Sequence, residues 1–269
     1  MKKKIALLLS VAMAATLCFT GCGSSNSNSD SSSGTEDKVY AVEAGSAGEA
    51  VAKEKDWKIN SVSSQADALM EVKSGTSDAA IIDLLMAGAM IGEGTSYPDL
   101  KYTDNLTTEE YGIGCRKGSD LVSYINAFLG ETYASGEMQK IAETYGVQEA
   151  LVEQQESTYE AAESDSDVEY IKKKGNLIVG ITEFEPMDYQ DEDKNWIGFD
   201  ADMASLLAEK LGVEVKFVVI DWDTKAMELD SKNLDVVWNG MTLTDEVKNA
   251  MDCTNAYCNN AQVVVVSAE

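Results

Sequence analysis

The sequence predicts an α/β protein made of two similar lobes. Short strand-like runs alternate with helical patterns in residues 38–147 and again in residues 168–269. Alternation of this kind favours parallel sheets that helices cover on both faces. Residues 148–167, between the two blocks, are rich in Glu, Ser and Ala and have no sustained apolar stripe, so we expect a surface linker that is partly helical.

The individual elements follow from apolar spacing and from turn residues. Strands are expected at residues 39–43, 59–62, 78–83, 177–182, 215–220, 235–238 and 262–266. One helix is expected at 65–74, where Gly75 ends it, and another begins with Asp200 as its cap and ends at Gly212. Shorter helices are expected at 223–230 and directly after Thr244.

An internal repeat supports the similarity of the two lobes. Residues 68–83 align without gaps on residues 225–240, and each segment reads as a helix, a turn and a buried strand. The strands run out into Asp83 in one copy and Asn239-Gly240 in the other. Ligands of open α/β sheets bind at the carboxyl ends of strands. We therefore expect a ligand cleft between the lobes, lined by these strand ends.

The N-terminus indicates export. Three lysines precede the apolar residues 5–17, which are too few to span a bilayer comfortably, and Cys22 follows small residues as in a lipobox. We predict a signal peptide at 1–21, lipidation of Cys22, and a flexible tether at 22–37 composed mostly of Ser, Asn and Gly. The protein is then extracytoplasmic and lipid-anchored to the cell membrane. An ordinary cleaved signal with an incidental cysteine is the alternative.

Composition excludes several classes of function. The chain has 47 acidic and 21 basic residues and no histidine, with a formal net charge of −26, so nucleic acid is not an expected partner. Without histidine there is no Ser-His-Asp or Cys-His catalytic site and no histidine metal site, and no cofactor is expected. Cys115, Cys253 and Cys258 form no disulfide framework, and the last two are either bridged or free thiols.

Three segments of the second block carry a family resemblance: GITEFEPM at 180–187, GFDAD at 198–202, and residues 234–246. They resemble the first lobe of the polar amino-acid-binding proteins of ABC importers, which have the type II periplasmic-binding-protein fold. Residues 42–49, 77–83 and 111–118 resemble the second lobe of the same family. The resemblance implies a monomeric solute-binding lipoprotein, not an enzyme, that captures an amino acid or similar small polar ligand for the permease of an ABC importer.

The lobes stand in reversed order compared with that family. Residues 38–110 resemble the second lobe, 111–147 the hinge return and closing helices of the first lobe, and 168–269 the rest of the first lobe. We interpret this order as a circular permutation in which 148–167 joins the former termini and the new ends lie at one hinge crossing. The lobes are expected to be joined mainly near Tyr111. Two separately folded half-domains and a swapped dimer are the alternatives.

Candidate ligand contacts come from the same motifs. Ser46 and Glu49 form a capping box, and the amides at Ser46, Ala47 and Gly48 offer a seat for a carboxylate, or else a plain helix cap. Asp83 matches the carboxylate that holds the ligand ammonium, or else caps a helix at 84–90. The resemblance adds aromatic and strand-end candidates, whose alternatives are core packing and an ordinary turn: Phe184, Gly240, Thr242 and, more weakly, Trp222 and Trp238.

The family's arginine for the ligand carboxylate is missing. After Thr244-Asp245-Glu246 the sequence has Val247, and its only arginine is Arg116 in the return strand. Either amides and hydroxyls hold the carboxylate, or the ligand is not an ordinary free amino acid. A sensing module without transport and a lyase-like or dehydratase-like enzyme using Glu183, Glu185 and Asp83 are the rival functions.

Overall fold

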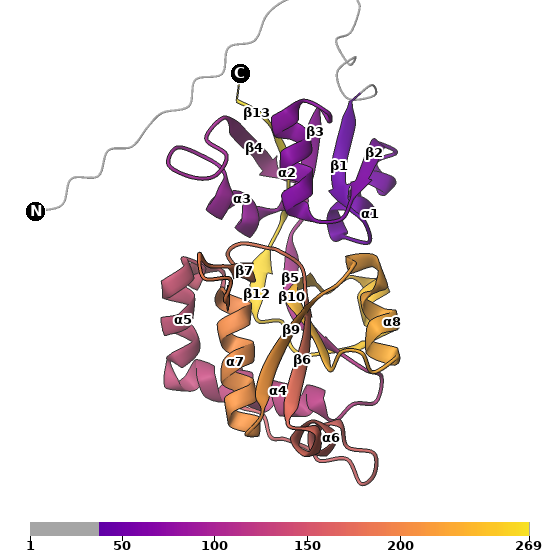
Figure 1. Cartoon of the computed structure of the whole chain (residues 1–269), viewed down its shortest axis with the longest axis vertical. Coiled ribbons are helices and arrows are strands. Elements are labelled where there is room, and N and C mark those ends of the chain that lie inside the picture. Colours follow the sequence, from indigo (N-terminus) through magenta and orange to yellow (C-terminus); the bar gives the residue numbers. More distant parts are fainter. Residues whose placement is uncertain (1–37, 269) are drawn as a thin grey trace, which may run out of the picture. The chain divides into compact units, whose positions relative to one another are not determined.

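The computed structural model of the protein describes residues 38–268, which lie in one compact unit with two main β-sheets (Figure 1). The predicted signal peptide, Cys22 and the tether lie outside the described residues. Among residues 38–268, no helix combines the length and apolar character needed to cross a membrane.

The five-stranded sheet has the order β2-β1-β3-β13-β4. Its strands are β1 (Val39–Glu43), β2 (Lys58–Val62), β3 (Ala79–Asp83), β4 (Leu100–Asn105) and β13 (Gln262–Ser267). β1 runs parallel to β2 and β3, whereas β13 is antiparallel to β3 and β4. The helices of this part are α1 (Ala47–Glu54), α2 (Gln65–Ser74) and α3 (Leu84–Met90). Ile81 of β3 packs in one hydrophobic cluster and its neighbour Ile82 in another, because side chains alternate between the faces of a strand.

The six-stranded sheet has the order β11-β5-β10-β6-β9, and β12 also pairs with β5. Its strands are β5 (Glu109–Cys115), β6 (Asn176–Ile181), β9 (Glu214–Val219), β10 (Val236–Thr242), β11 (Asp252–Cys253) and β12 (Cys258–Asn260), beside the hairpin of β7 (Tyr189–Gln190) and β8 (Trp196–Ile197). Its helices are α4 (Leu121–Ser135), α5 (Glu137–Tyr145), α6 (Asp167–Lys174), α7 (Phe199–Leu211), α8 (Lys225–Asp230) and α9 (Asp245–Ala250), with 3-10 turns η1 (Gln148–Ala150) and η2 (Trp222–Thr224). Cys115, Cys253 and Cys258 are free thiols.

Four predicted capping residues act at helix ends in the structure: Ser46, Gly75, Gly212 and Thr244. The hydroxyl of Ser46 accepts a hydrogen bond from the amide of Glu49 at 3.1 Å, and Thr244 does the same for Val247. Gly75 and Gly212 end their helices in the left-handed conformation. The prediction that Asp200 caps α7 is wrong. The cap is Gly198, at φ +126°, where a Cβ would lie 2.2 Å from the carbonyl oxygen of Met187.

The chain crosses between the two sheets twice. Residues 106–108 lead from β4 to β5, and Ala261 leads from β12 to β13. The two crossings lie side by side, since the amide of Leu106 donates to Gln262 O at 2.7 Å and the amide of Gln262 donates to Thr107 Oγ1 at 2.8 Å. The predicted last strand is therefore present but sits between β3 and β4, so the C-terminus leaves from the five-stranded sheet and not from a hinge crossing (Figure 1).

The segment between the blocks packs against the six-stranded sheet and its helices. After η1 it is extended, and the amide of Val152 donates to Tyr257 O at 2.9 Å. Its far end meets the start of α4, where the carboxylate of Asp120 accepts hydrogen bonds from the Ser166 hydroxyl at 2.5 Å and from the Asp167 amide at 2.9 Å. The linker thus ends at a capped helix start, because Asp120 satisfies amides in the first turn of α6.

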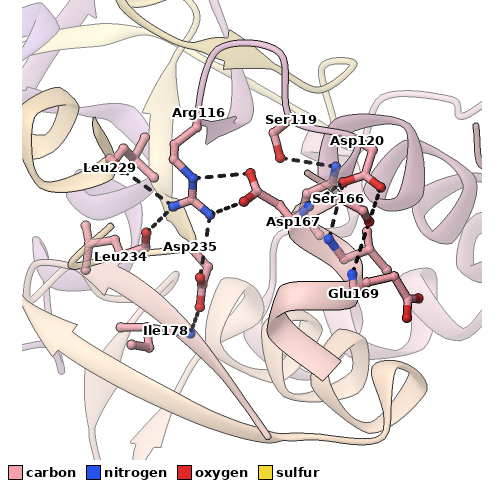
Figure 2. A network of polar contacts seen from close by, with 12 residues as sticks. Arg116, Ser119, Asp120, Ser166, Asp167, Glu169, Ile178, Leu229, Leu234 and Asp235 are labelled. Carbon is pink, nitrogen blue, oxygen red and sulfur yellow. Dashed lines mark hydrogen bonds and ion pairs between the residues drawn. The ribbon is translucent and has the colours of Figure 1, made fainter. Parts of the chain in front are cut away.

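Arg116 joins the same corner to the sheet. Its guanidinium forms an ion pair with Asp167 at 2.9 Å, lies 3.7 Å from the carboxylate of Asp235, and donates to Leu234 O at 2.6 Å (Figure 2). Arg116 is 7% exposed, and none of these partners lines the cavity described below. The arginine of the sequence is therefore a structural ion-pair residue at the base of the six-stranded sheet.

Candidate ligand-binding site

A cavity of about 320 Å³ lies where the two sheets face each other. Its walls come from the carboxyl ends of β1, β3 and β10 and from the first turns of α1, η2, α8 and α9. Six of the predicted ligand residues line it: Ser46, Ala47, Asp83, Trp222, Gly240 and Thr242. Gly48 and Phe184 do not. A cavity of this size, with apolar walls and a few polar groups, is typical of a small-molecule site.

The start of α1 forms one wall. Gly45 has φ +71°, and a Cβ there would lie 2.7 Å from the Cα of Asp223, so this turn packs directly on the opposite wall. Ser46 N donates to Glu43 O, and the amides of Ala47 and Gly48 have no acceptor among the described residues. Gly48 is buried behind Ala47, because a Cβ there would lie 3.0 Å from Ile81 O. These unpaired amides at a helix start favour a negatively charged ligand group.

Asp83 lies at the end of β3 and is 4% exposed. It precedes α3 but makes no side-chain cap to that helix. Instead its carboxylate accepts hydrogen bonds from the Tyr111 hydroxyl at 2.8 Å and the Gln262 amide at 3.0 Å, and from the side-chain amides of Gln65 and Asn260. Burial, followed by the charge of Glu109, raises the pKa of Asp83 to about 7 despite these donors. Four donors use most of the acceptor capacity of one carboxylate.

The aromatic candidates occupy different environments. Trp222 lines the cavity and is 8% exposed. Phe184 lies behind Gly240, since a Cβ on Gly240 would come within 2.5 Å of the Phe184 ring, and Phe184 also meets Tyr111 edge to face. Trp238 is fully buried against Tyr257. Phe184 and Trp238 therefore pack in the core, and Trp222 is the aromatic wall of this cavity.

The end of β10 forms the facing wall. Gly240 has φ +55°, and its amide donates to Asp200 at 2.7 Å. The Thr242 hydroxyl donates to Glu109 at 3.0 Å. Val247, at the start of α9, also lines the cavity and offers no charge or hydrogen bond. The cavity therefore has no charged side chain at position 247, where the sequence lacks an arginine.

Two buried charged residues of the cavity were not among the sequence candidates. Glu43, the last residue of β1, is 2% exposed, and its Oε1 has no hydrogen-bond partner among the described residues. Burial, followed by the nearby Asp83, raises the pKa of Glu43 to about 8. Lys225, the first residue of α8, is 8% exposed, and burial lowers its pKa. The repeat held a signal for Lys225, which aligns with the fully buried Ala68.

Candidate groups for chemistry are fewer than the sequence suggested. Glu183 and Glu185 do not line the cavity, so of the three proposed carboxylates the cavity contains Asp83. Within residues 38–268 no cluster of three or more Cys, Asp or Glu is arranged to hold a metal ion. The arrangement provides polar and charged groups for holding a small polar molecule.

The structure has two α/β lobes with a cavity between their strand ends, an arrangement suited to binding a small molecule. Residues 177–269 match the family model of bacterial extracellular solute-binding proteins, family 3.

Three curated relatives illustrate the range of functions among proteins similar to this chain. The L-cystine-binding protein TcyJ of Escherichia coli is 38% identical over 32% of this chain and 33% of its own length. The arginine-binding extracellular protein ArtP of Bacillus subtilis is 36% identical over 38% of this chain and 39% of its own. The cyclohexadienyl dehydratase of Pseudomonas aeruginosa is 30% identical over 30% and 31%. The chain thus spans about a third of the length of the relatives it matches, and most of those relatives are amino-acid-binding proteins.

Proposed function

We propose that the protein is an extracytoplasmic, lipid-anchored solute-binding protein that captures an amino acid or similar small polar ligand for the permease of an ABC importer. The observation that carries the proposal is the cavity of about 320 Å³ between strand ends of both sheets, at the positions that the family resemblance assigns to ligand. The match of residues 177–269 to a solute-binding family and the cystine-binding and arginine-binding relatives support it.

In this proposal the ligand carboxylate lies at the start of α1, against the amides of Ala47 and Gly48 and the Ser46 hydroxyl, with Thr242 opposite. The ligand ammonium lies on the side of Asp83, and the side chain of the ligand packs on Trp222. This wall requires glycine at position 240, because any side chain there would collide with the Phe184 ring. Phe184 contributes by fixing that wall from behind.

We also propose that the chain is a circular permutant of this class and acts as a monomer. The closing helices α4 and α5 come before β6, and the linker at 148–167 connects them to α6 along the six-stranded sheet. A variant with residues 168–269 placed before 38–147 should then fold and bind like the natural chain. A permuted order that is essential to the fold would abolish folding of that variant.

Native mass spectrometry of freshly purified protein tests the ligand class. The expected result is a species heavier than the chain by the mass of one amino acid or close derivative, released by mild denaturation. Recovery of a sugar, a nucleotide or a lipid in that position would refute the amino-acid class. The mass also separates cystine-like from arginine-like ligands without any prior choice of probe.

A second function has one observation in its favour. The carboxyl groups of Glu43 and Asp83 line one cavity with pKa values of about 8 and about 7, so both hold protons close to neutral pH, as acid-base catalysts do. The cyclohexadienyl dehydratase of Pseudomonas aeruginosa is one of the proteins similar to this chain. One-dimensional NMR of the released ligand incubated with the protein separates the two functions, because a binding protein leaves the spectrum unchanged and a lyase produces an unsaturated product.

A further inference from the structure

We infer that Lys225 and Glu43 hold the two ends of a zwitterionic ligand, with Lys225 supplying the cation that Val247 lacks and Glu43 supplying a carboxyl group that ionises beside the ligand ammonium. The inference rests on the proposed function and assigns the charged contacts of the same cavity. Both residues line that cavity, Glu43 from the end of β1 and Lys225 from the start of α8.

The surroundings of Lys225 favour a ligand anion. Its ammonium donates to Trp222 O at 3.0 Å and to Gly45 O at 3.1 Å and lies 4.7 Å from the centroid of the Trp222 ring. A lysine ammonium has three donors, so one donor is left. No carboxylate of the described residues lies within 4.0 Å of it. The carboxylates of Glu43, Glu246 and Asp223 act on it from beyond this distance, and burial still lowers its pKa, so a ligand carboxylate in direct contact would stabilise the charged form.

The position of Lys225 also agrees with the carboxylate seat at α1. Gly45 O, which accepts from Lys225, is two residues before Ala47, whose amide has no acceptor. A carboxylate at this helix start would therefore meet two unpaired amides and one ammonium. Charge-assisted hydrogen bonds of this kind are about twice as strong as neutral ones. Lys225 thus offers what the missing guanidinium would have offered, from α8 in place of α9.

Glu43 offers the complementary acceptor. Asp83 already accepts four hydrogen bonds from protein groups, whereas Glu43 Oε1 accepts none. Glu43 and Asp83 end the neighbouring parallel strands β1 and β3, so a ligand ammonium beside Asp83 also meets Glu43. The free oxygen of Glu43 can accept a hydrogen bond from the ligand ammonium without displacing a protein donor. The pair selects ligands that carry both charges.

Calorimetry on Lys225→Met tests the inference with pairs of probes that differ only in their carboxylates. The probes are L-arginine with agmatine, L-histidine with histamine, and L-cystine with cystamine. Whichever amino acid binds the natural protein should bind Lys225→Met at least about 30-fold more weakly, while its decarboxylated partner changes by less than about 3-fold. Glu43→Gln should weaken both members of the pair, because both keep the ammonium group.

Matched controls distinguish a Lys225 that contacts the ligand from a Lys225 that only holds the two walls of the cavity together. Lys216→Met and Glu54→Gln remove exposed charges and should leave every affinity unchanged. Lys225→Arg keeps the cation and should keep a preference for the amino acid over the amine, and it supplies the comparison if the methionine variant does not fold. Equal weakening of amino acid and amine in Lys225→Met, or natural affinity, would overturn the inference. Absence of binding by the natural protein to every common amino acid and to L-cystine would instead refute the proposed function.

Discussion

The hydroxyl of Tyr111, on β5 of the six-stranded sheet, donates a 2.8 Å hydrogen bond to the carboxylate of Asp83 at the end of β3 in the five-stranded sheet. Both residues are buried. Tyr111 lies a few residues after the crossing at 106–108, and Asp83 lines the cavity. Burial, followed by the charge of Asp83, raises the pKa of the Tyr111 hydroxyl well above its usual range, so it stays a donor. Asp83 therefore belongs both to the ligand cavity and to the polar network that holds the two sheets together.

The first prediction follows from that double role. Asp83→Ala should weaken ligand binding by about 2 to 5 kcal/mol, or roughly 30-fold to several thousand-fold, because it removes a buried charged partner and leaves four donors unpaired. Tyr111→Phe is the matched control. It removes one of the four donors and should cost less than about 10-fold. Calorimetry with the ligand identified by mass spectrometry measures both, and natural affinity in Asp83→Ala would show that the ligand lies elsewhere.

The second prediction concerns Arg116. Arg116→Met should lower the free energy of unfolding by about 3 to 5 kcal/mol, because it leaves Asp167 without its buried ion-pair partner (Figure 2). Lys172→Met, which removes an exposed ion pair with Glu169, should cost less than about 1 kcal/mol. Urea unfolding measures both variants. A loss of ligand affinity in Arg116→Met without a loss of stability would place the guanidinium in the binding site after all.

The third prediction concerns pH. Burial raises the pKa of Asp200 to about 7, and burial followed by the charge of Asp200 raises the pKa of Asp188 well above its usual range. Unfolded aspartates titrate near 3.9, so folding favours the protonated forms. The stabilisation is complete below about pH 4 and is lost as the pH rises through 7.

The free energy of unfolding should accordingly fall by about 2 to 3 kcal/mol between pH 5 and pH 8 for a single such group. Asp188→Asn cannot ionise and relieves the charge on Asp200, so its stability should depend less on pH than that of the natural protein. Urea unfolding at pH 5, 6.5 and 8 gives, for each of the two proteins, the slope of the free energy of unfolding against pH. Identical slopes in both proteins would mean that this buried pair does not control the pH dependence.

How far the sequence predicted the fold depends on how local each signal is. β1 and α2 have the predicted bounds, and Gly75, Gly212 and Thr244 act as predicted, because capping and turn geometry depend on a few adjacent residues. β13 was predicted as a buried strand but placed in the wrong block. Its run of four valines shows burial without showing which sheet receives it.

The candidate site was likewise predicted where its signals are local, and missed where they depend on the tertiary structure. Strand ends and helix starts brought Ser46, Ala47, Asp83, Trp222, Gly240 and Thr242 to one cavity, because parallel strands end at the same edge. Phe184 lies one layer behind, since an aromatic beside a glycine can face either the ligand or the core. Glu43 and Lys225 were missed because an acidic or basic residue is usually exposed, and the tertiary structure shows that these two are buried.

The fourth prediction concerns the N-terminus, which lies outside the described residues. Cys22→Ser should move the protein from the membrane fraction to the soluble fraction, because a lipid anchor requires the cysteine thiol. Cys253→Ser is the matched control, since that thiol is free and lies in the six-stranded sheet. Immunoblots of fractionated cells measure the distribution. Unchanged membrane retention of the Cys22 variant would reject the lipoprotein prediction.

The central claim is that the cavity between the two sheets binds one amino-acid-like ligand. Calorimetric titration of unfolded, dialysed and refolded protein with the common amino acids and L-cystine tests it most directly. The account predicts one ligand per chain with a Kd in the micromolar range or tighter for at least one of them. Refolded protein that binds none of them with a Kd below about 1 mM, or about −4.1 kcal/mol, would contradict it.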